Sequence, residues 1–222
     1  MWWVILALLI FFLFQDIYKI FKVKLPERTN VARSIVKSYF LIILIALFIR
    51  TFLIQAYMIP SGSMEDTLKR GDFLLVLKFV YGIRIPFTEV RILNFHKPQR
   101  QEIIVFEAPP AALYPDIPPD GPQKDYIKRC IGLPEELIDI KGKEIYINGK
   151  LLEEHYTAFK PSIYNSENDA LHFEIPKNCY LMLGDNRNNS HDGRRWGFLS
   201  YSYIKGKAFI LYFPINRIKI IK

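Results

Sequence analysis

Two apolar segments near the N-terminus constrain the fold of this chain more than any other feature. The first runs from Met1 to Phe14 and is rich in Trp, Leu, Ile and Phe. A helix needs about 20 residues to cross about 30 Å of hydrocarbon. Extending the run to the neighbourhood of Lys19 reaches that length, so we predict a first transmembrane segment over residues 1–20. A cleaved secretory signal is the alternative, but no Lys or Arg precedes the run and no A-x-A site follows it.

The second apolar segment runs from Ser38 to about Ile59 and contains Arg50. An arginine near the end of a span can extend its charge to the membrane interface. A buried amphipathic helix of a soluble domain should instead show a polar face, and Phe40–Ile49 contains no polar residue. We therefore predict a second transmembrane segment over residues 38–58.

A basic stretch, residues 21–37, separates the two apolar segments. Short basic loops stay on the cytoplasmic side of a membrane, which would place both chain ends outside. Residues 59–222 then form an extracytoplasmic domain. The formal net charge of +8 needs no nucleic-acid partner, because this stretch explains part of it and membrane lipid is close by.

From Pro60 onward, short apolar runs alternate with turn signals, and no long amphipathic helix is predicted. Asn148-Gly149 is a strong signal for a two-residue hairpin. We predict a mostly β domain of curled antiparallel sheets, barrel-like or sandwich-like. The predicted strands are Phe73–Phe79, Ile103–Phe106, Tyr126–Ile131, Leu137–Ile140, Glu144–Ile147, Tyr180–Leu183 and Ala208–Phe213.

Several kinds of chemistry lack their residues in this sequence. There is no CxxC pair, HExxH, P-loop, GxGxxG or GxSxG, so we predict neither a metal nor a cofactor. Two SxxK patterns, at Ser34 and Ser202, lack the companion motifs of SxxK enzymes. The two cysteines, Cys130 and Cys179, could form a disulfide or remain buried thiols.

Two short segments hold a candidate nucleophile and base. Ile59-Pro-Ser-Gly-Ser-Met64 forms a turn that can present a hydroxyl together with a backbone N–H, as acyl transfer requires. Lys128 follows two apolar residues in a predicted strand, where alternation sends it and Arg129 to opposite faces. Burial can lower the pKa of a lysine by up to about 3–5 units, which makes the neutral amine available as a base near pH 7. A Ser-His-Asp triad that uses His191 remains an alternative.

These segments, in this order, closely resemble the bacterial type I signal peptidases, a family of serine peptidases with a Ser/Lys dyad. The resemblance lies in IPSGSM, GDFLLVLKFVYG, DYIKRCIGLP and GDNRNNSHDGRRWGF, and it includes the N-terminal anchor. It implies a β-rich fold and an enzyme that cleaves signal peptides from exported preproteins at the outer face of the cytoplasmic membrane. The implied partners are preproteins emerging from the export machinery.

The resemblance also implies roles for individual residues. Ser63 would be the nucleophile and Lys128 the general base, Ser61 would contribute to the oxyanion hole, and Ser190 would orient the Lys128 amine. Asp192 and Arg194 would form a supporting ion pair, with Arg129 nearby. Shallow apolar pockets that accept small residues at substrate positions −1 and −3 would be lined by Ile59, Met64, Leu68, Tyr126 and Ile127.

The sequence departs from the family pattern in two places. In the box after Gly184, Asn188 stands where an acid is usual and Gly193 where a serine is usual. The usual P-x-R-G-D reads Pro98-Gln-Arg-Gln-Glu102, which predicts an altered turn. Neither departure falls on the candidate pair.

Two other classes of protein fit parts of this pattern. A self-cleaving repressor also uses Ser and Lys, but it is soluble and carries a DNA-binding domain, whereas this chain begins with apolar segments. A membrane-tethered binding module for exported chains would keep the apolar groove without needing both Ser63 and Lys128. The sequence therefore favours the peptidase.

Overall fold

The computed structural model describes residues 27–84, 91–92, 96–113, 123–157 and 170–221. The chain divides into two compact units, Met1–Ile49 and Arg50–Lys222. The predicted first transmembrane segment, residues 1–20, lies outside the described residues.

The described part of the N-terminal unit is a long helix, α2 (Glu27–Phe48), which a π-helical turn, Ile49–Leu53, extends. Val36–Leu53 is long and apolar enough to cross a membrane, with a mean hydropathy of 2.0. It is the one such segment in the part of the chain that the structure describes. The predicted span over residues 38–58 ends too late, because Ile54–Met58 forms strand β1. An apolar run of this kind does not itself mark where a helix gives way to a strand.

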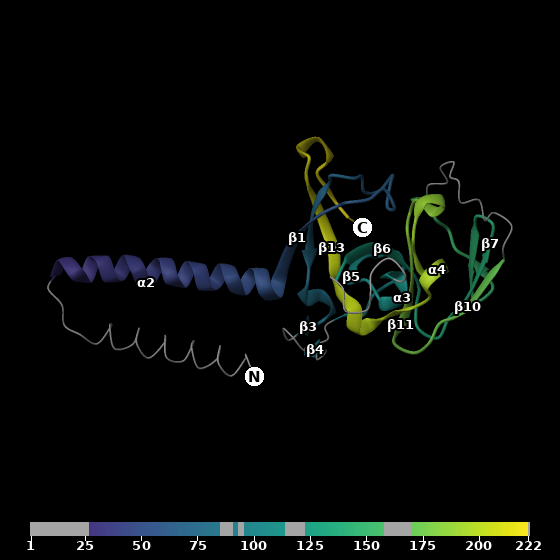
Figure 1. The fold of residues 1–222 in the computed structure, drawn as a ribbon, viewed down its shortest axis with the longest axis horizontal. Coiled ribbons are helices and arrows are strands. Elements are labelled where there is room, and N and C mark those ends of the chain that lie inside the picture. Colours follow the sequence, from purple (N-terminus) through teal and green to yellow (C-terminus); the bar gives the residue numbers. More distant parts are fainter. Residues whose placement is uncertain (1–26, 85–90, 93–95, 114–122, 158–169, 222) are drawn as a thin grey trace. The chain divides into compact units, whose positions relative to one another are not determined.

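The β-rich unit is built around a large antiparallel sheet, shown in Figure 1. Its strands follow the order β1-β2-β13-β5-β6-β11-β12, and β14 pairs with β13. The bounds are β1 (Ile54–Met58), β2 (Phe73–Leu77), β13 (Ile204–Phe213), β5 (Ile103–Glu107), β6 (Asp125–Gly132), β11 (Cys179–Leu183), β12 (Leu199–Ser200) and β14 (Lys219–Ile220).

A smaller antiparallel sheet has the order β10-β7-β8-β9. Its strands are β10 (Leu171–Glu174), β7 (Leu137–Lys141), β8 (Glu144–Ile147) and β9 (Lys150–Leu151). The predicted hairpin is confirmed, because Asn148 (φ 49°) and Gly149 (φ 78°) join β8 to β9 in the left-handed conformation of such turns. A two-stranded ribbon pairs β3 (Ile83–Arg84) with β4 (Arg91–Ile92).

The helices described in the β-rich unit are short. They are α3 (Pro110–Leu113), α4 (Gly193–Trp196) and the 3-10 turns Phe79–Tyr81, Arg187–Asn189, Tyr201–Tyr203 and Ile215–Arg217. The mostly β fold with a curled antiparallel sheet is confirmed, and each of the strands predicted from the sequence overlaps an observed strand. The predicted pair of membrane helices is not, since one candidate helix is described.

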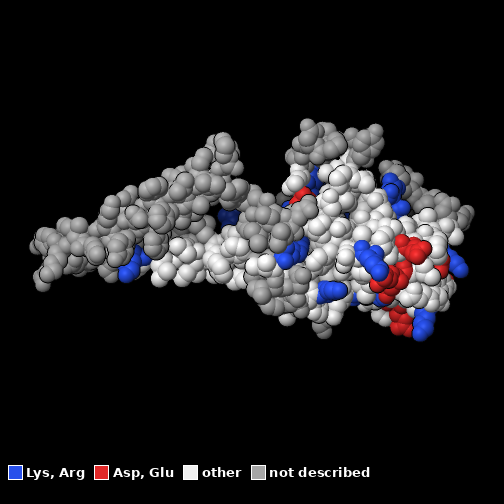
Figure 2. Space-filling view, turned by 90° about the horizontal axis from the view of Figure 1, so that it is seen from below, with Lys and Arg blue, Asp and Glu red and all other residues white. Residues whose placement is uncertain are grey.

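Three apolar clusters form the core of this unit. The first lies under the loop between β1 and β2 and contains Ile59, Met64, Leu68 and Ile127. Cys130 belongs to the second cluster, and it and Cys179 are free thiols. On the face shown in Figure 2, basic and acidic side chains lie next to one another over one end of the β-rich unit, so that end has no surface of a single charge.

Candidate active site

Ser63 lies on the loop that joins β1 to β2. The ends of this loop are held by backbone hydrogen bonds from Ile59 N to Asp72 O (2.8 Å) and from Gly71 N to Ile59 O (2.9 Å). Gly71 has φ 88°, which a residue with a side chain rarely adopts. Within the loop, Leu68 N donates to Met64 O at 2.7 Å. These bonds close a compact turn that presents Ser63 with 7% of its surface exposed.

Lys128 reaches this turn from strand β6. Its Nζ donates a hydrogen bond to Ser63 Oγ at 2.6 Å, and only 4% of Lys128 is exposed. Among the described residues, β11 pairs with β6 at Arg129, Cys130 and Gly132 and not beside Lys128. In the described part of the chain, the edge of β6 beside Lys128 therefore has no strand partner.

The surroundings of Lys128 favour its neutral form. The pKa of the amine is lowered from 10.5 to about 8, chiefly by burial, and Arg194 acts in the same direction. The Asp192 and Asp185 carboxylates act in the opposite direction and raise this pKa. Desolvation is the larger effect, so a neutral amine next to the Ser63 hydroxyl is accessible at mildly alkaline pH.

The other two predicted serines also lie beside this pair. Ser61 Oγ is 3.4 Å from Ser63 Oγ. Ser190 is buried, and its side chain packs against Gly184, where an added Cβ would come within 2.1 Å of Ser190 Oγ and 2.6 Å of Ser63 O. Among the described residues, Ser190 Oγ makes no hydrogen bond of good geometry, and the predicted bond to Lys128 is not formed here.

The loop that begins at Gly184 holds the Ser63 turn in place. Asn186 N donates to Ser63 O at 3.1 Å, and Asn186 Nδ2 donates to Gly62 O at 3.1 Å. Because Gly184 has no side chain, the two backbones can approach this closely. The 184–190 loop therefore fixes the position of the candidate nucleophile through its backbone.

Asp192 and Arg194 form the predicted ion pair, with Arg194 Nε 2.9 Å from Asp192 Oδ1. Burial alone would raise the pKa of Asp192, but Arg194 and the Gly184 N–H together hold it below its usual value. The Ser190 hydroxyl contributes in the same direction. Asp192 therefore stays ionised and anchors the start of the 184–190 loop through Gly184 N at 3.0 Å.

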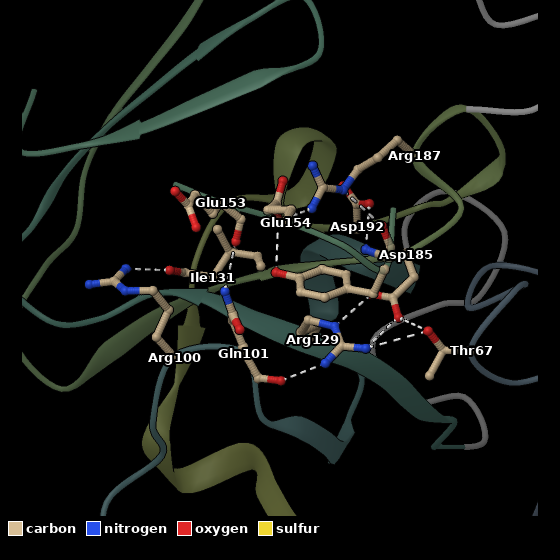
Figure 3. A network of polar contacts seen from close by, with 12 residues as sticks. Thr67, Arg100, Gln101, Arg129, Ile131, Glu153, Glu154, Asp185, Arg187 and Asp192 are labelled. Carbon is tan, nitrogen blue, oxygen red and sulfur yellow. Dashed lines mark hydrogen bonds and ion pairs between the residues drawn. The ribbon is translucent and has the colours of Figure 1, made fainter. Parts of the chain in front are cut away.

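Arg129 pairs with Asp185, a residue that was not among the predicted site residues. The guanidinium Nη2 lies 2.6 Å from Asp185 Oδ2, and the two side chains are 4% and 0% exposed. Thr67 Oγ1 donates to the same carboxylate at 2.6 Å, and Arg129 Nη1 donates to Gln101 O at 2.7 Å (Figure 3). As expected from alternation along β6, Lys128 and Arg129 have separate partners.

The predicted pocket residues fall into two groups. Ile59, Met64, Leu68 and Ile127 belong to one apolar cluster beneath the Ser63 turn. Tyr126 packs instead with the second cluster, where its ring centroid is 6.3 Å from that of Phe106. Lys128 Nζ lies 5.7 Å from the Tyr126 ring centroid, so Tyr126 is a neighbour of the candidate base.

Gly193 and Gln101, two of the residues that depart from the family pattern, have local explanations. A Cβ on Gly193 would come within 2.8 Å of Leu181 Cδ1 and 3.0 Å of Met182 O, so a glycine lets α4 pack closely on β11. Gln101 adopts φ 70°, in the left-handed region that favours glycine. Its carbonyl is held by Arg129, which stabilises this turn without a glycine.

Several residues at this site gave no separate signal in the sequence. Asp185 and Asn186 lie inside the GDNR motif, and the Asp185 carboxylate is the feature of that motif that indicates a partner for Arg129. Thr67, Glu154 and Tyr156 come from segments without a motif. No group of three or more His, Cys, Asp or Glu side chains in the described ranges is arranged to hold a metal ion.

Comparison with known proteins assigns this chain to a family. The model of the family described as signal peptidase, peptidase S26, matches residues 32–213. Signal peptidase I of Pseudomonas aeruginosa is 35% identical over 211 residues, covering 79% of this chain and 70% of the relative. Signal peptidase I of Leptolyngbya laminosa is 37% identical over 193 residues, covering 87% and 85%.

A solved structure, that of a signal peptidase I from Enterococcus faecalis, is 30% identical to this chain. It covers 50% of this chain and 97% of its own length, with a TM-score of 0.38.

Proposed function

This chain belongs to the signal peptidase family of S26 serine peptidases, and from that premise we propose that it cleaves signal peptides with a dyad of Ser63 and Lys128. The observation that carries the proposal is the 2.6 Å contact between Lys128 Nζ and Ser63 Oγ, both buried. Among the described residues, the hydrogen-bond partners of Ser63 Oγ are Lys128 and Ser61.

In the first step, the neutral Lys128 amine takes the Ser63 proton while Ser63 Oγ attacks the carbonyl carbon of the residue at position −1. The oxyanion that forms is stabilised by the Ser63 N–H and the Ser61 hydroxyl, whose Oγ lies 3.4 Å from the attacking oxygen. The protonated lysine then gives its proton to the leaving amine as the peptide bond breaks.

The second step releases the signal peptide from the enzyme. A water molecule gives a proton to Lys128 and attacks the acyl carbon, and Ser63 Oγ leaves and regains a proton from the lysine. The pKa of Lys128, about 8, lets the same amine serve as acceptor and donor in both steps. The mechanism requires no metal or cofactor.

We assign the substrate-binding side to the open edge of β6 beside Lys128. Among the described residues, this edge of β6 has no strand partner over Asp125–Lys128, whereas its other edge pairs with β5. A preprotein segment in extended conformation can add to such an edge through its backbone. Ile59, Met64, Leu68 and Ile127 form an apolar cluster at the Ser63 turn, and an apolar lining of this kind suits small side chains at positions −1 and −3.

We also propose that the enzyme works at the extracytoplasmic surface of the cytoplasmic membrane. The helix Val36–Leu53 is apolar enough to anchor the chain, and the basic residues before it favour a cytoplasmic start. The β-rich unit exposes an apolar patch in β1, β13, β14 and the turn that precedes β14, which suits contact with lipid. The patch consists of Met58, Phe209, Tyr212, Phe213, Ile215, Ile218 and Ile220.

The test is cleavage of a preprotein that carries an A-x-A site by the detergent-solubilised full chain. We expect cleavage after the second alanine, and loss of cleavage in Ser63→Ala and in Lys128→Ala. Cleavage that survives either substitution contradicts the dyad.

The control for the competing triad is His191→Ala. His191 is exposed, and we expect this variant to cleave at close to the wild-type rate. Loss of cleavage in His191→Ala, with activity retained in Lys128→Ala, would establish the triad instead.

A further inference from the structure

The segment that follows β9 covers the strand that carries Lys128. The Arg129 guanidinium carbon lies 3.8 Å from the centroid of the Tyr156 ring, and Tyr156 OH donates to Glu154 Oε1 at 2.8 Å. Burial and the Glu154 carboxylate raise the pKa of Tyr156, so its hydroxyl keeps the proton that it donates. We call residues Glu154–Tyr156 the strap; Figure 3 shows Glu154 above Arg129.

The strap is joined to the 184–190 loop by a buried ion pair. Arg187 Nη2 lies 2.5 Å from Glu154 Oε1, and the side chains are 4% and 6% exposed. Removing two charges from water costs free energy that their attraction repays only in good geometry, so a buried pair is weak evidence for stability. A role in fixing one conformation is therefore the more informative interpretation of this contact.

Arg187 transmits this restraint to the Ser63 turn. Its Nε donates to Gly184 O at 3.1 Å, and its own carbonyl accepts from Arg194 Nη2 at 2.6 Å. Between Gly184 and Arg187 lies Asn186, which donates to Ser63 O and Gly62 O. The carboxylate of Glu154 thus fixes the 184–190 loop through Arg187, and the same loop fixes the Ser63 turn.

We propose that Glu154, assisted by Tyr156, is a positioning residue that keeps Ser63 Oγ within reach of Lys128 by fixing the 184–190 loop through Arg187. This inference rests on the proposed function, because it assigns Glu154 a part in the dyad's geometry. Displacing reacting groups by about 1 Å can lower a rate by about 100-fold, so a distant contact of this kind can control turnover.

The charges that shift the pKa of Lys128 distinguish positioning from an electrostatic effect. Besides burial, they are those of Asp192, Asp185 and Arg194, and Glu154 is not among them. Removing the Glu154 charge should therefore lower the rate without moving the pH at which Lys128 titrates. Among the described residues, the charged and titratable groups in contact with the Glu154 carboxylate are Arg187 and Tyr156.

The neighbouring residue Glu153 provides a matched control. It lies in the same segment and can undergo the same substitution, but it is exposed. Its backbone carbonyl, and not its carboxylate, accepts a hydrogen bond from Gln101 Nε2 at 3.1 Å. Glu153→Gln removes the same charge from the same segment and leaves the bonds of the strap intact.

The experiment measures kcat, KM and the pH profile of preprotein cleavage for the full chain and its variants. For Glu154→Gln we expect kcat to fall about 10- to 100-fold, with KM within about threefold of wild type and an unchanged acid limb. Tyr156→Phe keeps the ring over Arg129 but removes the bond to Glu154, and we expect a fall of about two- to fivefold. Glu153→Gln should match the wild type.

Thermal unfolding of every variant, with assays well below each Tm, separates folding from positioning. If Glu154→Gln unfolds below the assay temperature, two other measurements test positioning. One is kcat of Tyr156→Phe. The other compares kcat of the double variant Glu154→Gln/Arg187→Gln with kcat of Arg187→Gln alone. We expect the double variant to be no slower than Arg187→Gln, because Glu154 acts through Arg187.

Three results overturn the proposal: a kcat for Glu154→Gln equal to that of Glu153→Gln, an acid limb displaced by a pH unit or more, or effects of Glu154→Gln and Arg187→Gln that multiply. Failure of the proposed function looks different, because the wild-type chain would then not cleave or Ser63→Ala would still do so.

Discussion

The two main sheets of the β-rich unit differ in the solvent exposure of their ion pairs. In the large sheet, Arg129 and Asp185 are paired with side chains 4% and 0% exposed. Two pairs of the small sheet and its flanking turns lie in solvent: Lys177 and Glu135 are 82% and 65% exposed, and His172 and Asp139 are 63% and 35% exposed. The buried carboxylate of Glu154, which follows β9, is paired with the 184–190 loop instead. Beneath these surface pairs, isoleucines of β7 and β8 supply the packing.

This contrast separates groups that stabilise the fold from groups that serve the site. Exposed pairs contribute about 0–1 kcal/mol, because water and salt screen them. Buried charges cost desolvation free energy, and the large sheet concentrates them around Ser63 and Lys128. Burial of these charges makes the large sheet less stable where the proposed chemistry requires a neutral amine and a fixed loop. The exposed pairs of the small sheet carry no such desolvation cost.

Lys128→Met has the largest expected effect, and a different outcome would remove the contrast between the two sheets. We expect cleavage to fall by about 1,000-fold or more, because the base is lost. At the same time the protein should become more stable at pH 7. The folded pKa of about 8 lies below the unfolded value of 10.5, so below pH 8 the charged lysine opposes folding, and this cost disappears as pH rises toward 10.5.

Urea unfolding at pH 7 and at pH 10 measures this gain. It should be up to about 3 kcal/mol at pH 7 and smaller at pH 10, after the loss of attraction to Asp192 is allowed for. A variant less stable than wild type at both pH values would show that the buried lysine does not lower the stability of the large sheet.

Asp185→Asn tests the buried ion pair. The substitution leaves the Arg129 guanidinium buried without its carboxylate, and we expect a loss of about 3–5 kcal/mol in the free energy of unfolding. Chemical denaturation at neutral pH checks this. In the small sheet, Asp139→Asn removes a carboxylate from an exposed pair and should change stability by less than about 1 kcal/mol. Equal losses from the two variants would remove the distinction between the sheets.

The pH dependence of cleavage sharpens the comparison further. Only the neutral Lys128 amine can accept the Ser63 proton, so kcat should rise about tenfold per pH unit below pH 8 and level off above it. Initial rates measured between pH 5 and 10 on a preprotein substrate give this profile. A rate that levels off near pH 6.5, the ordinary range of histidine, would contradict the assignment of the base.

The smallest effect is expected from Lys177→Ala. Its side chain is 82% exposed and lies 3.6 Å from Glu135, so its removal should change the free energy of unfolding by less than about 0.5 kcal/mol and leave cleavage unaltered. Thermal unfolding in low and high salt would detect a larger contribution. A loss above 1 kcal/mol would mean that surface pairs of the small sheet stabilise it after all.

Much of the fold follows from local patterns in the sequence. Alternation and apolar runs locate β2, β5, β6, β7, β8, β11 and β13, and the Asn148-Gly149 dipeptide fixes the hairpin between β8 and β9. These features depend on residues close together in the chain. The candidate pair could be named for a similar reason, since Ser63 and Lys128 each lie in a distinctive short segment.

The remaining features depend on contacts between distant residues. Strand β1 continues an apolar run without a break, and only its pairing with β2 shows that Ile54–Met58 is a strand. Glu154 and Tyr156 lie in a segment of ordinary composition, and their importance follows from where Arg187 and Arg129 meet them in space. The absence of a hydrogen bond from Ser190 to Lys128 in the described part of the chain is likewise a matter of side-chain geometry.

The place of β13 in the large sheet bears on how the enzyme is made. Ser63 belongs to the β1–β2 hairpin and Lys128 to the β5–β6 pair, and β13 lies between β2 and β5 (Figure 1). A ribosome produces residues 204–213 after all of these strands. Until then, the candidate nucleophile and the candidate base lie on two hairpins that no strand joins into one sheet. Assembly of the candidate pair therefore depends on β13, which lies far from both residues in the sequence.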